Sequence, residues 1–164
     1  VFSKMLEVEA IASNEVIKVK FEVDTNPPEY ASYENKYKLL PLPYQITLYD
    51  MPSLFSGKIH AVLCRGWANR IKGRDLYDYV FYLSGTTPFN LKHLKARLVQ
   101  TGHISENEEL TLDDVKRMLR ERFSSIDYDQ AKQDVLPFIK RTNAIDLWSE
   151  DFFSKITETL KCKD

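Results

Sequence analysis

The chain has 164 residues, which is enough for one domain or one and a half. Its apolar share of 43% and aromatic share of 12% exclude an intrinsically disordered chain and allow a real core. The net charge of −1 predicts no general electrostatic attraction of the whole protein to nucleic acid or to a membrane.

The charge is unevenly distributed along the chain. Residues 57–78 hold 5 basic and 2 acidic residues, whereas the segments on either side are net negative. This one basic segment is either a solvated helix–loop surface or a functional site for anions.

Cysteine use and hydropathy indicate the compartment. Cys64 and Cys162 are far apart and have no CxxC spacing, which is typical of the reducing cytoplasm. No run approaches about 18 consecutive apolar residues, and no signal peptide is recognisable, so we expect a cytoplasmic protein without a membrane partner. The chain begins at Val1 in strand-like sequence, which indicates a fragment that lacks its upstream part.

Two alternating runs open the chain. Residues Phe2–Ala12 and Ile17–Val23 place apolar and polar side chains in turn, which predicts two half-buried strands. We expect them to form an antiparallel hairpin around Ser13–Glu15. Pro27 and Pro28 end the second strand because proline cannot extend a ladder.

Glu22 and Asp24 lie at the end of this second strand. Carboxylates at i and i+2 of a strand project in the same direction. They are either a solvent-facing strand edge or a carboxylate pair that binds a metal or acts as a general base.

The next elements lead into the basic segment. We expect a short strand at Tyr37–Leu40, a stronger one at Tyr44–Tyr49, and a helix over Pro52–Arg65 capped by Ser53. Apolar residues at helical spacing predict the buried face of this helix: Phe55, Ile59, Val62 and Leu63.

A second helix is predicted over Arg74–Ser84, after a basic loop that contains glycine. Asp75 and Asp78 stand one helical turn apart near its start. The helix dipole alone would explain Asp75, but it explains neither Asp78 nor the basic residues before it.

Helical patterns continue to the end of the chain. Asn90, Thr111 and Asp127 are expected to begin helices, and a last helix is predicted over Ala144–Leu160. The fold class is therefore α+β, with antiparallel strands in residues 1–50 followed by a helical bundle in residues 51–164.

The residue types limit the possible chemistry. The three histidines and two cysteines have no zinc-ligand spacing in sequence, so no zinc site is expected, and His60 is interpreted as a packed or surface residue. Carboxylates with a lysine and arginines suit phosphoryl chemistry with a divalent metal.

The spacing of these charges is similar to a known pattern. Lys58-x-x-Ala61-x-x-x-Arg65, a basic loop, Arg74-Asp75-x-x-Asp78 and then Tyr82-Leu83 resemble the C-terminal motifs of the AbiEii/AbiGii family of nucleotidyltransferase-like toxins. The strand in VKFEVDTNPP is similar to the family's strand that carries a further active-site carboxylate.

The resemblance implies a partial nucleotidyltransferase-like core joined to a helical domain. It also implies transfer of a nucleotide from an NTP with Mg²⁺, an acceptor such as tRNA or another RNA, and a cognate antitoxin as partner, as in type IV toxin–antitoxin and abortive-infection systems.

By position, the resemblance also implies a role for each residue of the motif. Lys58 would bind the NTP phosphates, and Asp75 would be the catalytic carboxylate or base. Asp24, with Glu22, would bind the metal. Arg65 and Arg74 would bind phosphate or position carboxylates, and Asp78 would support Asp75 or anchor its helix.

The chain departs from the family pattern at its beginning. In the family, a glycine/serine-rich turn with a D-x-D pair comes before the strand that VKFEVDTNPP resembles; residues 1–21 contain no such pair, so both features would lie before Val1. We therefore expect that this chain alone has no transferase activity and holds no Mg²⁺ or NTP tightly, either as a fragment or as a degenerate member. The alternative is a non-catalytic module that binds RNA or an antitoxin through loop 65–74.

Overall fold

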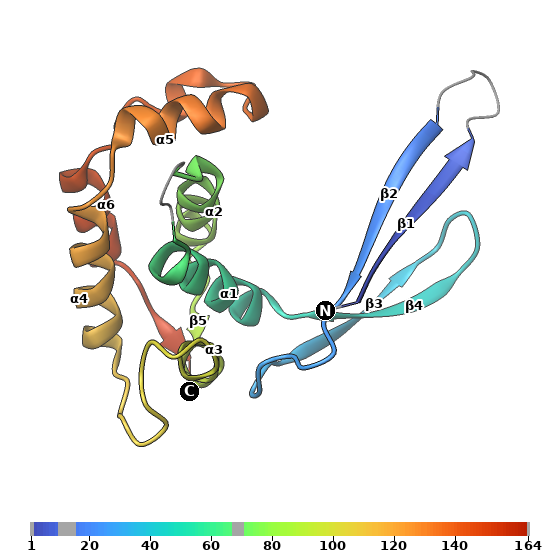
Figure 1. Ribbon diagram of the computed structural model, residues 1–164, viewed down its shortest axis with the longest axis horizontal. Helices are drawn as coiled ribbons and strands as arrows, with labels where there is room; N and C mark the ends of the chain where they lie inside the picture. Colours follow the sequence, from blue (N-terminus) through green and yellow to red (C-terminus); the bar gives the residue numbers. More distant parts are fainter. Residues whose placement is uncertain (1, 10–15, 67–70, 164) are drawn as a thin grey trace.

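The computed structural model describes residues 2–9, 16–66 and 71–163. It is α+β, as expected: two antiparallel hairpins precede a helical body (Figure 1). The turn predicted at Ser13–Glu15 and residues 67–70 of the basic loop lie outside the described residues.

The hairpins are formed by the first four strands: β1 (Phe2–Glu9) with β2 (Val16–Val23), and β3 (Tyr33–Lys38) with β4 (Tyr44–Tyr49). The short strand predicted at Tyr37–Leu40 was wrong in its bounds. Pairing of Tyr33 with Tyr49 extends β3 toward its start, and the segment with Pro41 and Pro43 ends it because proline cannot donate to a ladder.

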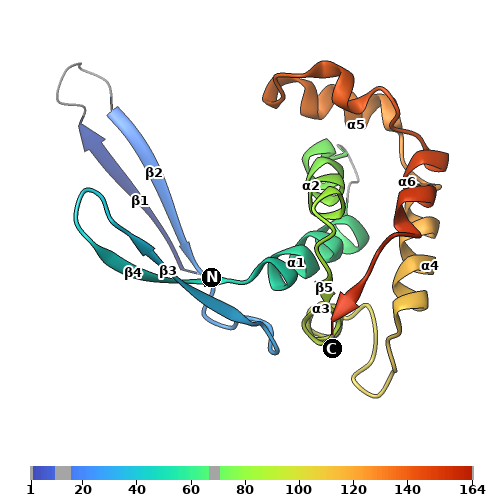
Figure 2. The ribbon, with the colours of Figure 1, turned by 180° about the vertical axis from the view of Figure 1, so that it is seen from behind.

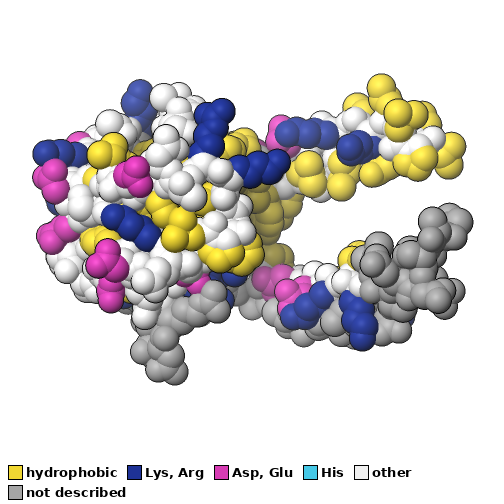
Figure 3. Space-filling view, turned by 90° about the horizontal axis from the view of Figure 1, so that it is seen from above, with side chains coloured by type: hydrophobic (Ala, Val, Ile, Leu, Met, Phe, Trp, Pro, Cys, Tyr) yellow, Lys and Arg dark blue, Asp and Glu magenta, His cyan; other side chains and the backbone are white. Residues whose placement is uncertain are grey.

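Both hairpins leave apolar side chains exposed. The largest exposed fractions occur in and after β3, where Tyr37, Leu40 and Leu42 are 72% to 82% exposed. Figure 3 shows apolar side chains along one of the two arms that extend from the helical body. An isolated two-stranded hairpin is marginally stable, so these faces are typical of a surface that packs against another layer.

The helical body contains six described α-helices: α1 (Met51–Cys64), α2 (Gly73–Ser84), α3 (Leu91–Gln100), α4 (Leu112–Phe123), α5 (Tyr128–Val135) and α6 (Glu150–Thr157). The predicted starts at Asn90, Thr111 and Asp127 are confirmed, because each side chain caps its helix. The expected cap of α1 was wrong: Asp50 is the cap, and it accepts a hydrogen bond from the backbone N of Ser53 at 2.9 Å.

The last predicted helix was also wrong in its extent. The range Ala144–Leu160 contains part of the 3₁₀ turn η2 (Thr142–Ile145) and the shorter α6, while the 3₁₀ turn η1 (Leu136–Phe138) follows α5. Ser149 accepts a hydrogen bond from the backbone N of Phe152 and so starts a new helix.

A parallel pair of two-residue strands closes the body: β5 (Phe89–Asn90) and β6 (Cys162–Lys163). Figure 2 shows the end of the chain returning beside β5, next to α3. Strands this short leave no periodic pattern in the sequence, which is why they were not predicted.

α1 lies at the centre of the core. Phe55, Ile59 and Val62 are fully buried, as predicted, and α1 packs against α2, α3 and α4. The ring of Phe55 stacks on Tyr82 with centroids 5.0 Å apart, and it also meets Tyr79 and Phe89. The position of the charged residues on α1 and α2 is therefore fixed by this aromatic core.

Within the part of the chain that the structure describes, no helix has the length and apolar character needed to cross a membrane.

Gly73, the first residue of α2, packs closely against the backbone of α5, and a substitution at this position tests that contact. A Cβ at Gly73 would lie 2.0 Å from the backbone oxygen of Ala131, whereas a Cβ at Gly66 would meet nothing within 4 Å. We expect Gly73→Ala to lower the free energy of unfolding by about 3 kcal/mol, because backbone atoms must move apart. The control Gly66→Ala should change it by less than about 0.5 kcal/mol in urea unfolding. Equal stability of the two variants would contradict the packing.

Candidate active site

Two ion pairs connect α1 and its C-cap residue Arg65 to α2, and they use four of the five charged residues of the sequence motif; the fifth, Arg74, is in neither pair. Lys58 Nζ lies 2.6 Å from Asp78 Oδ2. One guanidinium nitrogen of Arg65 donates to both carboxylate oxygens of Asp75, at 2.8 and 2.6 Å. Each basic residue of the first part of the motif, Lys58 and Arg65, thus pairs with one carboxylate of the second part.

The pairing follows from helix geometry. Lys58 and Arg65 are seven residues apart and so lie on the same side of α1, about 10 Å apart along its axis. Asp75 and Asp78 are three residues apart on α2. The residue late in one helix pairs with the residue early in the next, as in two consecutive helices joined by a short connection.

The two pairs differ in burial. The side chain of Asp75 is 7% exposed and that of Arg65 is 43% exposed, whereas Lys58 and Asp78 are 39% and 36% exposed. A buried carboxylate needs a cation to replace its lost hydration, and Arg65 supplies it. Lys58 remains at the surface, where its ammonium group can meet an anion from solution.

Helix α4 holds the end of α1 beside this site. Arg122 on α4 donates from Nε to the carbonyl of Val62 at 3.1 Å and from a terminal nitrogen to the carbonyl of Arg65 at 2.8 Å. Carbonyls at the end of a helix have no partner within the helix, so these bonds satisfy them. They also fix the backbone from which the Arg65 side chain extends toward Asp75.

Helix α5 holds the start of α2 in a similar way. Asp134 accepts a hydrogen bond from the backbone N of Gly73 at 3.0 Å, and Gln130 accepts one from the backbone N of Ile71 at 2.8 Å. Asp75 is thus placed by contacts that come from α1 and α5.

Arg74 lies on another side of α2 and lines a groove between α2 and the segment after α5. Its guanidinium carbon lies 5.1 Å from the ring centre of Phe138, which is a cation–π distance. We call this the basic groove, and its polar and aromatic lining comprises Arg74, Tyr77, Asp78, Phe138, Lys140 and Arg141. Three cations with exposed aromatic rings form a surface suited to a nucleic-acid strand.

Glu22 and Asp24 make contacts separate from this cluster. Glu22 pairs with Lys20 on its own strand, and Asp24 accepts a hydrogen bond from the backbone N of Asn26 at 3.1 Å. β2 ends at Val23, so Glu22 lies on the strand and Asp24 lies one residue beyond its end. The contacts described for these two carboxylates do not reach the charges on α1 and α2.

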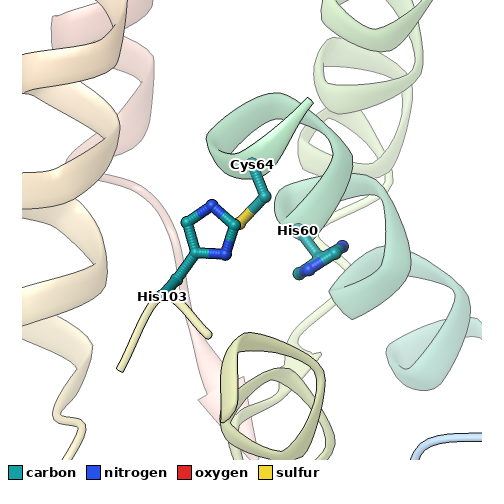
Figure 4. Close-up of side chains that lie close together, drawn as sticks. All are labelled: His60, Cys64 and His103. Atoms are coloured by element: carbon teal, nitrogen blue, oxygen red, sulfur yellow. The ribbon is translucent and has the colours of Figure 1, made fainter. Parts of the chain in front are cut away.

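A cluster that sequence analysis missed lies at the end of α1. A nitrogen of His60, the sulfur of Cys64 and a nitrogen of His103 lie within 4.8 Å of one another (Figure 4). Burial and the charges of Arg97 and His103 lower the pKa of His60 to about 4. Burial raises the pKa of the Cys64 thiol to about 11, against the effect of Thr101 and Arg122. The i, i+4 spacing of His60 and Cys64 was the available signal, but His103 comes from a different element.

Comparison with protein families defines the class of this chain. Residues 3–154 match the family described as nucleotidyl transferase AbiEii toxin of type IV toxin–antitoxin systems. The match covers most of the chain, which therefore belongs to the AbiEii family, as the motif residues indicated. Comparison with curated proteins and with solved structures gives no significant match.

The difference in burial between the two ion pairs predicts different stability effects. Arg65→Ala leaves the Asp75 carboxylate buried without its cation. We expect this variant to lower the free energy of unfolding by about 2 kcal/mol, a value that already allows for the partial exposure of Arg65. Lys58→Ala breaks a more exposed pair and should cost less than about 1 kcal/mol. Urea unfolding of both variants checks this, and an equal loss would contradict the assigned difference.

Proposed function

We propose that this chain forms one wall of a nucleotidyltransferase site that transfers a nucleotide from an NTP to an RNA acceptor such as tRNA. The observation that carries the proposal is the pair of contacts, Lys58 with Asp78 and Arg65 with Asp75, in a member of the AbiEii family. These substrates would place its action in the cytoplasm, with a cognate antitoxin as the regulating partner.

Each charged residue has a distinct role in this proposal. Lys58 binds the phosphates of the NTP, because it is exposed and stays next to Asp78 until an anion replaces that contact. Asp75 is the catalytic carboxylate, and Arg65 orients it by binding both of its oxygens. Arg65 is thus a positioning residue. Arg74 binds phosphate at the edge of the basic groove.

The metal ligands in this proposal are Asp24 and Glu22. Carboxylate oxygens are hard ligands that suit Mg²⁺, and both side chains lie in an exposed part of the chain, so the donor set fits this ion. When bound, Mg²⁺ would neutralise phosphate charge. Two carboxylates alone form an incomplete set of ligands, so we expect this chain alone to bind Mg²⁺ and NTP only weakly.

The remaining parts of such a site are not in this sequence. No glycine/serine-rich turn with a D-x-D pair precedes β2, and the D-x-D string Asp127-Tyr128-Asp129 stands at the start of α5 instead. The exposed apolar faces of the two hairpins support a partial core in residues 1–50 that packs on another layer, joined to a helical region in residues 51–164. We therefore propose that the 164-residue chain alone transfers no nucleotide.

The basic groove is the proposed site of the RNA acceptor. Arg74, Lys140 and Arg141 would bind phosphates, and the exposed ring of Phe138 would stack on a base. Asp78 is shared between this groove and the Lys58 pair, so the acceptor and the NTP would approach from adjacent sides of α2.

A second function is a non-catalytic module that binds RNA or an antitoxin. The basic groove itself favours this alternative, because binding a strand through its cations and aromatic rings would not need the missing carboxylates. The two functions differ in the expected effect of Asp75, which is essential for transfer and dispensable for binding.

Transfer is tested with the protein of the complete open reading frame, each labelled NTP, Mg²⁺ and total tRNA. We expect incorporation that Asp75→Asn lowers about 100- to 10,000-fold, because the catalytic carboxylate is lost. RNA affinity should be unchanged.

The matched control for this variant is Asp113→Asn. Asp113 is exposed and stands in the first turn of α4, as Asp75 stands in the first turn of α2. The Asp113→Asn variant should therefore retain full transfer activity. Incorporation by the 164-residue chain alone, or no incorporation by the complete protein, would refute the proposal.

The basic groove is tested by the salt dependence of RNA binding. The double variant Lys140→Ala with Arg141→Ala should weaken RNA binding. It should also make the negative slope of log K against log salt less steep by about 1.4, which is about 0.7 for each lost contact to a single strand. The matched double variant Lys92→Ala with Lys95→Ala changes two lysines that line a different hollow, on α3, and should leave the slope unchanged. If the Lys92/Lys95 variant changed the slope and the Lys140/Arg141 variant did not, the RNA would bind at α3 and not in the basic groove.

A further inference from the structure

We propose that His60, Cys64 and His103 form a binding site for a divalent transition metal of the zinc type. His60 and Cys64 stand on successive turns of α1, and His103 follows α3, so the three side chains approach from two elements (Figure 4). One donor atom from each residue lies within 4.8 Å of the others. This site is separate from the Asp24 and Glu22 carboxylates and does not depend on nucleotide transfer.

The two imidazole rings are aimed at a common point. The hydroxyl of Thr101 lies 3.0 Å from His60 Nε2 and 2.9 Å from His103 Nδ1. Its own proton is directed to the carbonyl of Arg97 at 2.9 Å. A single small atom thus already bridges the two rings, at a position that a metal ion would take over after the Thr101 side chain turns away.

The distances require only a small contraction. Zinc bonds of about 2.0–2.3 Å in a tetrahedral site place donor atoms about 3.5 Å apart. The donors here are within 4.8 Å, so closure needs movements of about 1 Å. His103 is exposed in the turn after α3, and rotation of its side chain can provide this movement.

The donor atoms select the metal. Two imidazole nitrogens and one sulfur suit Zn²⁺ and Co²⁺, whereas Mg²⁺ prefers oxygen ligands. Cysteine coordinates as the thiolate, so binding transfers the thiol proton to solvent. Three protein ligands leave a fourth position for water, as in open zinc sites.

The location of the site suggests a structural role. Cys64 is the last residue of α1 and directly precedes Arg65, which pairs with Asp75. A metal ion would connect the end of α1 to the segment after α3, next to the Arg122 contacts from α4. It would therefore stabilise the backbone that positions Arg65.

The test is titration of the metal-free, reduced chain with Co²⁺ and then with Zn²⁺. We expect one Co²⁺ per chain, with a sulfur-to-metal charge-transfer band in the near ultraviolet that Zn²⁺ abolishes and excess Mg²⁺ does not. Zn²⁺ should also raise the Tm, since it binds the folded chain.

Variants assign the ligands. Cys64→Ser should remove the charge-transfer band, and His103→Ala should weaken binding at least tenfold. His103 is exposed, so this second variant keeps the test valid even if the Cys64 variant unfolds. The control Cys162→Ser changes the other cysteine of the chain, which lies on β6, and should bind Co²⁺ like the parent chain.

Thr101→Val removes the bridging hydroxyl with little change of shape and should retain binding. The proposal is overturned if the parent chain binds no Co²⁺, if binding survives both ligand variants, if Cys162→Ser loses the charge-transfer band, or if Thr101→Val abolishes binding.

Discussion

The contact on which the candidate site depends is the ion pair between Arg65 and Asp75. A carboxylate that is only 7% exposed would be strongly destabilising without a cation, and one arginine nitrogen binds both of its oxygens. The pair therefore fixes how the end of α1 meets the start of α2. The other charges of the motif, Lys58, Arg74 and Asp78, stay at least partly exposed to solvent.

The rest of the helical body supports this contact from several directions. Arg122 on α4 binds two carbonyls at the end of α1, and Asp134 on α5 binds the backbone N of Gly73. The absence of a Cβ at Gly73 lets α2 approach the backbone of α5 closely. Helices that are distant in sequence thus hold the two residues of the pair in position, and the proposed roles of Arg65 as positioning residue and Asp75 as catalytic carboxylate rest on this rigidity.

The hairpins and the helical body differ in how far they bury their apolar side chains. The body buries a continuous aromatic and aliphatic core around Phe55 and Tyr79. The hairpins instead expose apolar side chains such as Leu40 and Tyr37, as strands do when they belong to a larger sheet. This contrast agrees with the proposal that the chain holds one wall of a site, with a complete helical region and a partial core.

The sequence alone determined the α+β order of elements, the caps at Asn90, Thr111 and Asp127, and the motif charges, because these features depend on local spacing and hydrogen bonding. It could not determine which charges pair, that Asp75 is buried, or that His103 joins His60 and Cys64. Those contacts join residues from different elements. They depend on how α1, α2 and α3 pack, and packing is decided by the tertiary structure as a whole.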